Sequence, residues 1–400
     1  MMRTGATIGF LALGIAAGAL WAQPTFTHLK SVDLSSYFTS GGPQGDAVSD
    51  VAFDGRNLYV AGFSTRAITD PVPVGVLKIG NVLSPDTNQW SYVPLISLTQ
   101  AAQSRVSYVV YKDGSLYLGT GLGDGSGNPA FTGIRKFDAT TGASDPLWNG
   151  TGMVMPSDLT PGTTTRMECV AIDPGYQGSG ESLAILARGR GFIFRRDFAL
   201  GTALPNILAV PTRPDGSTTT GMRDISFAPS GDAYLRVDNS VWYAQRTGGN
   251  TVAGNRSNLL LDFSSDSALQ VQINVLYLPT PSGDLLLFNR RVGDNSLRKV
   301  FVYRGSGASW TPYREITGDE PLRDGTTPAA FARDVLNFTY GDGPDPSAGD
   351  VNLDGTVDDA DLLQVLFAFG GSDANADING DGIVDDADLL QVLFAFGSGC

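Results

Sequence analysis

The sequence predicts a mainly β fold, a β-propeller, followed by a small α-helical module near the C-terminus. Three observations lead to this prediction. The chain of 400 residues contains 50 Gly and 22 Pro, a turn-rich composition that favours many short strands over long helices. One strand-turn-strand unit recurs through the body of the chain. An acidic segment close to the C-terminus is duplicated almost without change.

Residues 1–22 have the layout of a secretory signal peptide. Arg3 precedes an uncharged, mostly apolar run at 6–21, and small residues before Gln23 offer cleavage sites. The run is shorter than the ~20 residues of a membrane span, and no second run of that kind follows. We therefore expect a secreted, extracellular protein without a transmembrane segment in the mature chain, either free or attached to the cell surface. A retained N-terminal anchor is the alternative.

The body of the chain, residues 23–340, repeats a hairpin signature. Each copy is an apolar strand, a turn of Asp, Gly, Pro or Ser, and a second apolar strand. Four copies align well, and a fifth has a longer loop; they lie at 51–60, 109–118, 170–186, 225–235 and 275–287. Further strand-like segments lie between the copies. About four strands in each 40–60 residues is typical of a propeller blade, because a small sheet buries both faces only between neighbours.

The number of blades depends on two incomplete copies. Residues 331–336 begin like an inner strand, and residues 26–33 resemble an outer strand. If both ends of the body complete one blade together, the ring closes. We expect five to seven blades, with six preferred, and an array of β-sandwiches is the alternative.

Carboxylates at the starts of inner strands are the candidates for catalysis. Asp50, Asp224 and Asp334 share one alignment position, and Glu168 falls one residue earlier in its copy. Asp50, Glu168 and Asp224 could supply the paired carboxyl groups, about 5–10 Å apart, that glycoside hydrolysis requires. The neighbouring Arg223 favours a simpler interpretation, in which these carboxylates link adjacent blades.

Composition excludes several other kinds of site. The only His is His28, so His-based metal sites and Ser-His or Cys-His catalysis are not expected. The only Cys residues, Cys169 and Cys400, are too few and too far apart for a disulfide scaffold, and Cys169 lies in an apolar strand pattern that predicts a buried thiol. The net charge of −14 argues against nucleic acid as a partner.

Most of the negative charge belongs to residues 349–400, which follow a Gly-Asp-Pro linker at 341–348. This segment holds 11 of the 41 acidic residues and no Lys or Arg, so the other 348 residues carry only 27 − 30 = −3. Its two halves, 349–370 and 376–397, align without gaps and are identical at 18 of 22 positions. The acidity is therefore patterned, unlike that of a disordered acidic tail.

Each half begins with the pattern of a twelve-residue calcium loop. Oxygen-bearing side chains stand at loop positions 1, 3, 5, 9 and 12, Gly stands at position 6, and the carbonyl of position 7 completes the set. In the first loop the expected ligands are Asp350, Asn352, Asp354, Thr356, Asp358 and Asp361. In the second loop they are Asp377, Asn379, Asp381, Ile383, Asp385 and Asp388. We predict two bound calcium ions, with the apolar position 8 residues Val357 and Val384 pairing the two loops.

A single helix should follow each loop. Leu362, Val365, Leu366 and Phe369 fall on one helical face, Gly370 ends the helix, and the second half repeats this arrangement. Phe367 and Phe394 are candidate exposed anchors for a partner. The alternative is that they pack between the two helices.

With its duplicated loop-helix pattern, the segment 349–397 resembles a type I dockerin. The resemblance implies calcium-dependent folding and docking onto a cohesin domain of a scaffold or cell-surface protein, and dockerins often carry polysaccharide-degrading enzymes. This chain departs from the family at loop positions 10 and 11, where Asp359-Ala360 and Asp386-Ala387 replace hydroxyl residues, and its helices lack basic residues. The partner can thus be a cohesin-like or another surface scaffold protein.

Three functions remain open at this point. The preferred one is a secreted calcium-binding protein whose dockerin-like tail, 349–400, tethers a propeller binding domain to a scaffold or cell-surface partner. The alternative is a dockerin-bearing glycoside hydrolase in polysaccharide catabolism, and a carbohydrate is considered as a ligand in either case. A third reading makes the tail a calcium-stabilised cap on the propeller.

Overall fold

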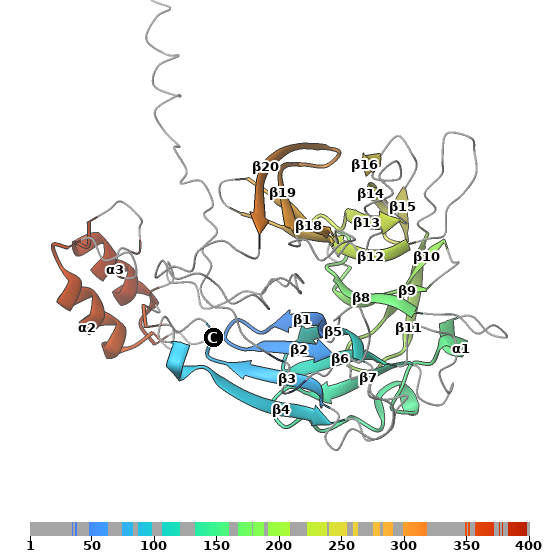
Figure 1. The fold of residues 1–400 in the computed structure, drawn as a ribbon, viewed down its shortest axis with the longest axis horizontal. Coiled ribbons are helices and arrows are strands. Elements are labelled where there is room, and N and C mark those ends of the chain that lie inside the picture. Colours follow the sequence, from blue (N-terminus) through green and yellow to red (C-terminus); the bar gives the residue numbers. More distant parts are fainter. Residues whose placement is uncertain are drawn as a thin grey trace, which may run out of the picture.

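The computed structural model has five groups of antiparallel strands placed in turn around a common axis (Figure 1). It describes residues 34, 37, 48–62, 74–82, 87–97, 106–120, 133–159, 167–177, 179–187, 191–208, 222–237, 240–253, 259–262, 275–280, 283–290, 299–317, 349, 351–352, 357–371, 376, 378 and 383–397. Five blades lie within the expected range and are one fewer than the preferred six. The two segments on which a sixth blade depended, 26–33 and 331–336, lie outside the described residues, as does the predicted signal peptide.

Each blade runs outward from the axis in chain order. Blade 1 is β1 (Val48–Phe53), β2 (Leu58–Gly62), β3 (Val74–Gly80) and β4 (Ser91–Ser97), with the 3-10 turn Thr87–Gln89 before β4. Blade 2 is β5 (Val106–Lys112), β6 (Ser115–Thr120) and β7 (Gly133–Asp138), followed by the 3-10 turn Trp148–Gly150 and the short helix α1 (Pro156–Leu159). Blade 3 is β8 (Met167–Asp173), β9 (Ser182–Ala187), β10 (Phe192–Arg196) and β11 (Ala203–Leu208).

The last two blades follow the same plan. Blade 4 is β12 (Met222–Phe227), β13 (Ala233–Val237), β14 (Ser240–Gly248) and β16 (Leu259–Asp262). Blade 5 is β17 (Val275–Leu278), β18 (Leu285–Arg290), β19 (Lys299–Ser306) and β20 (Ser309–Thr317). The additional strand β15 (Thr251–Ala253) pairs with β14 and, in parallel, with β11, so blades 3 and 4 share one continuous sheet.

The five hairpins predicted from the sequence are the two innermost strands of the five blades. They pair in register as expected, for example Val51 with Val60 in blade 1 and Ile225 with Leu235 in blade 4. Middle strands are buried on both faces, and all six residues of β9 are buried. One apolar cluster lies between each pair of blades that follow each other in the chain, so the sheets stabilise one another laterally.

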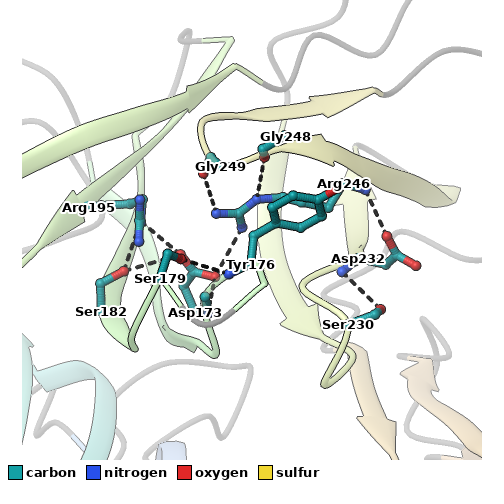
Figure 2. A network of polar contacts seen from close by, with 11 residues as sticks. Asp173, Tyr176, Ser179, Ser182, Arg195, Ser230, Asp232, Arg246, Gly248 and Gly249 are labelled. Atoms are coloured by element: carbon teal, nitrogen blue, oxygen red, sulfur yellow. Dashed lines mark hydrogen bonds and ion pairs between the residues drawn. The ribbon is translucent and has the colours of Figure 1, made fainter.

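A buried polar network also joins blades 3 and 4 (Figure 2). Asp173, at the end of β8, forms an ion pair with Arg195 Nε at 2.8 Å and accepts a hydrogen bond from Arg246 Nη1 at 3.0 Å. Asp173 and the Arg246 side chain are fully buried, and Arg195 is only 6% exposed. Arg246, on β14, also donates to the carbonyls of Gly248 and Gly249, so its guanidinium is satisfied from several sides.

The hairpin turns of these two blades approach closely beside this network. A Cβ atom on Gly231 would lie 2.5 Å from the carbonyl oxygen of Gly175, and Gly231 has a φ of +86°. Only glycine meets both conditions without strain. The ion pairs are thus held in place by backbone contacts as well as by side chains.

The C-terminal module contains the two predicted helices, α2 (Asp359–Ala368) and α3 (Asp386–Ala395). Their N-caps are Asp358 and Asp385, each in a capping box with the acidic residue three positions later. Val351, Val357, Val365, Ala376, Val384 and Val392 form the buried core, with Leu362 and Leu389 packed against it.

Two details of this module differ from the expectation. The backbones of Val357 and Val384 do not pair with each other among the described hydrogen bonds. Val384 instead pairs with Gly370 and Gly371 after α2, and Val357 accepts from Gly397 after α3. Each loop therefore packs on the end of the opposite helix, while both valines share the core.

The second difference concerns the buried face of the helices. Of the four residues expected on one helical face, Leu362 and Val365 face the core, but Leu366 and Phe369 are 46% and 50% exposed. The physical reason is that two ten-residue helices offer too little partner surface to cover a stripe this wide. Within the described residues, no helix is long and apolar enough to cross a membrane.

Candidate functional site

The inner strands of all five blades line one axial cavity of about 270 Å³. Its wall repeats from strand to strand of β1, β5, β8, β12 and β17, because the lining residues are 50–53, 108–111, 169–172, 224–227 and 275–277. Apolar residues and backbone make most of the wall. Aromatic side chains gather at the carboxyl ends of the strands, and they are Phe53, Tyr111, Phe227 and Tyr277. The two carboxyl groups, Asp50 and Asp224, stand nearer the other ends of their strands.

A β-bulge sets the polar layer in four of the five inner strands. The register shifts by one residue between Val48 and Asp50, between Val106 and Tyr108, between Met167 and Cys169, and between Met222 and Asp224. A bulge inserts one unpaired residue and redirects the strand. The structurally equivalent residues after the bulges are Asp50, Tyr108, Cys169 and Asp224, and all four line the cavity.

This geometry places two of the three candidate carboxylates, Asp50 and Asp224, at the cavity wall. The residue equivalent to Asp50 and Asp224 in blade 3 is Cys169. Glu168 is the bulged residue itself, and its side chain lies outside the described part of the structure. This agrees with the sequence alignment, in which Glu168 falls one residue before the position of Asp50 and Asp224.

Asp50 links blade 1 to blade 2. Its Oδ1 accepts the backbone N–H of Val51 at 2.9 Å, and its Oδ2 accepts the N–H of Val109 on β5, also at 2.9 Å. Burial raises the pKa of Asp50 to about 8, against the opposing effect of these hydrogen bonds, and the charge of Asp224 raises it further. The carboxyl group is surrounded by protein although one side of it borders the cavity.

Asp224 makes the equivalent link from blade 4 to blade 5. Its Oδ2 accepts the N–H of Val275 on β17 at 2.8 Å, and its Oδ1 accepts a hydrogen bond from Cys169 Sγ at 2.9 Å. Burial raises the pKa of Asp224 and also places the pKa of the Cys169 thiol well above its usual value. Cys169 is 3% exposed, so the buried thiol predicted from the sequence is confirmed.

The expected link between blades therefore exists. Among the described contacts, the carboxylates bind the backbone N–H of the next inner strand. The side chain of Arg223, the neighbour that the sequence suggested, lies outside the described part of the structure. A backbone donor at this position is supplied by any residue, so no sequence signal marks it.

These pKa values predict a pH-dependent stability. Between about pH 4 and 8 folded Asp50 keeps a proton that the unfolded chain has released, so stability should fall as pH rises through this window and level off above it. The variant Asp50→Asn removes this titration. We expect wild-type stability, measured by urea unfolding, to fall between pH 5 and 8.5 by about 2 kcal/mol or more relative to the variant.

The control for this experiment is Asp113→Asn, the same chemical change at a side chain that is 81% exposed. It should show the same fall with pH as the wild type. Parallel pH profiles of Asp50→Asn and wild type would show that Asp50 is ionised in the folded protein.

In the C-terminal module, the structure describes six of the twelve predicted calcium ligands. Asn352, Asp358, Asp361, Ile383, Asp385 and Asp388 are described, and Asp350, Asp354, Thr356, Asp377, Asn379 and Asp381 lie outside the described residues. Calcium binding therefore stays a prediction. The described half of the predicted ligands can be compared with the geometry of a calcium loop.

The described positions come together around the residue at position 12. Asp361 is fully buried, and its two oxygens accept the N–H groups of Asn352 and Asp358 at 2.9 Å each, so positions 3, 9 and 12 meet. Asp388 is equally buried and accepts from Ile378 at 2.7 Å and Asp385 at 2.9 Å. Residues 349–400 contain no Lys or Arg, so no basic side chain of this segment neutralises these buried carboxylates.

The fold and its axial cavity define a protein of the β-propeller class. No protein-family model matches the chain, and no curated protein matches it. The Dos1 propeller is 11% identical, covering 68% of this chain and 73% of its own, with a TM-score of 0.36. The Cps50 (Swd1) β-propeller domain of Myceliophteria thermophila is 10% identical, covering 69% of this chain and 75% of its own, with a TM-score of 0.38. A glycoside hydrolase is 13% identical, covering 74% of this chain and 64% of its own, with a TM-score of 0.37.

Proposed function

We propose that the chain is a secreted calcium-binding protein whose C-terminal module tethers the propeller to a scaffold or cell-surface partner. The partner is a cohesin-like domain or another surface protein with apolar pockets. The proposal rests on two features of residues 349–400. They are the duplicated calcium-loop pattern and the exposed surface of the two helices.

The exposed apolar face of these helices is the observation that carries the proposal. Phe367 and Phe394 are each 86% exposed, so they do not pack between the helices. Three further large apolar side chains on each repeat are about half exposed: Leu363, Leu366 and Phe369, and Leu390, Leu393 and Phe396. Large apolar side chains concentrated on one small module mark interaction surfaces, and exposed aromatic residues are typical anchors of such surfaces.

The test measures retention of the full chain on the surface of the cells that secrete it. We expect wild-type protein to be retained in calcium and released by a chelator. The double variant Phe367→Asp/Phe394→Asp should be retained at least tenfold less, because an interface anchor contributes about 2 kcal/mol or more. Each single variant should lose less, because the second repeat presents the same face.

Leu147→Asp is the matched control, since Leu147 is 78% exposed on the propeller. It should be retained like the wild type. If the double variant is retained as well as this control, or if the chelator releases nothing, tethering through this face is wrong.

A glycoside hydrolase is the second candidate function. Asp50 and Asp224 line the same cavity, and a carboxyl group with a raised pKa is what a general acid requires at neutral pH. Against this role, both carboxylates already accept backbone hydrogen bonds that join blades. A screen of the full chain on soluble polysaccharides, with Asp224→Asn and Asp113→Asn beside it, separates the two. Activity that only Asp224→Asn abolishes supports the enzyme, and no activity on any polysaccharide contradicts it.

A further inference from the structure

We propose that the axial cavity of the propeller binds a small organic cation, with its ammonium group between Asp50 and Asp224 and its apolar body along the inner strands. This is a ligand site of the propeller itself and does not depend on the tethering role of the C-terminal module.

The charge of the cavity wall favours a cation. Asp50 and Asp224 come from blades 1 and 4, which are not neighbours in the chain, and their charges interact unfavourably across the site. Among the described residues that line the cavity there is no Lys, Arg or His. An anion would meet two carboxyl groups there, whereas an ammonium group would relieve their mutual repulsion.

The remaining wall favours an organic ligand over a metal ion. Among the described residues, no three acidic, His or Cys side chains are placed so that they could hold one metal ion. Apart from Ser226 and the Cys169 thiol, the other lining side chains are aliphatic or aromatic, including Val51, Val170 and Phe227. An apolar body gains contact with such groups, and an aromatic face also attracts an ammonium group. The volume of about 270 Å³ admits a compact amine.

Binding should be linked to protons. The groups that face the two carboxyls are the Cys169 thiol, Tyr108 and, through its charge on Asp224, Arg236 on β13. Because burial raises the pKa of both carboxyls in the free protein, a bound cation favours their ionised forms and expels protons. Affinity should therefore rise between about pH 6 and 8.

The test is titration calorimetry of the full chain in calcium-containing buffer with benzylamine and choline as probes. Benzyl alcohol is the neutral isostere, glucose is the neutral sugar, and magnesium chloride is the metal arm. We expect at least one amine to bind, at least tenfold tighter than benzyl alcohol. Proton release should make the observed binding heat vary linearly with the ionisation heat of the buffer. Asp50→Asn and Asp224→Asn should each weaken amine binding at least tenfold, and Asp113→Asn should leave it unchanged.

Because Asp50 and Asp224 also join blades, a variant that leaves both carboxyls intact is needed. Ala171→Leu fills part of the cavity wall without touching either group, and it should also weaken amine binding. If the aspartate variants do not fold, the proposal is tested by amine binding to Ala171→Leu and by the pH dependence of amine binding to the wild type. The proposal is overturned if neither amine binds at millimolar concentration, if benzyl alcohol or glucose binds as well as the amines, if magnesium alone binds, or if Ala171→Leu binds amines like the wild type.

Discussion

Replacing Asp173 by Asn should lower the free energy of unfolding by about 3–5 kcal/mol, as expected when one partner is removed from a buried ion pair. Asp173 holds two guanidinium groups, Arg195 at 2.8 Å and Arg246 at 3.0 Å (Figure 2). The neutral amide would leave two buried cations without their anion. Since the pairs join β8 and β10 of blade 3 to β14 of blade 4, the interface between these blades should open first.

Removing one cation should cost less. In Arg195→Met the carboxylate of Asp173 keeps Arg246 and the N–H of Gly175, so its charge stays compensated. We therefore expect the loss for Arg195→Met to lie below that for Asp173→Asn. The free energies of unfolding of the two variants can be compared by urea unfolding, with tryptophan fluorescence as the signal.

Lys112→Met is the control, because it breaks a surface ion pair of similar length. Lys112 lies 2.6 Å from Glu181, and the two side chains are 25% and 44% exposed. Such pairs contribute about 0–1 kcal/mol. A loss for Asp173→Asn no larger than that for Lys112→Met would contradict a stabilising role for the buried network.

The sequence was sufficient for the hairpins and insufficient for the contacts between blades. A hairpin is encoded locally, as in the apolar runs that flank Asp113-Gly114, so its strands could be predicted. Asp173 and Arg246 are 73 residues apart, and nothing local to either residue indicates the other. Arg246 stands in an apolar strand, which suggests a buried partner without identifying it. The bulge that places Cys169 beside Asp224 is equally a property of strand pairing.

The C-terminal module shows the same division. The loop pattern predicted one helix for each loop, but not its first residue: each helix begins inside the loop at position 10, because Asp358 and Asp385 at position 9 are also the N-caps. The pattern could not predict which apolar residues remain exposed, because exposure depends on how much surface the other repeat supplies. For this reason the exposure of Phe367 and Phe394 could be determined only from the structure.

Removal of calcium should unfold the C-terminal module at neutral pH and leave the propeller folded. Asp361 and Asp388 are fully buried, and residues 349–400 contain eleven Asp and no Lys or Arg. Without a bound cation these charges repel one another, and the small core around Val365 and Val392 is the main apolar contribution that opposes them. Binding and folding are therefore expected to be coupled. A chelator should remove the helical circular dichroism of α2 and α3.

Calorimetry of the full chain, with a chain truncated after residue 348 as reference, gives the number of sites. We expect two calcium ions for the wild type, one for Asp361→Ala or Asp388→Ala, and none for the double variant.

Asp359→Ala is the matched control: it removes an exposed Asp from the same first turn of α2 and should keep both sites, at a cost of about 0.3–1 kcal/mol to the helix. Equal effects of Asp359→Ala and Asp361→Ala would mean that general acidity, and not the position 12 carboxylate, attracts calcium. Since Asp361 connects positions 3 and 9 of its loop, its loss should also uncouple α2 from that loop, which the exposed Asp359 cannot do.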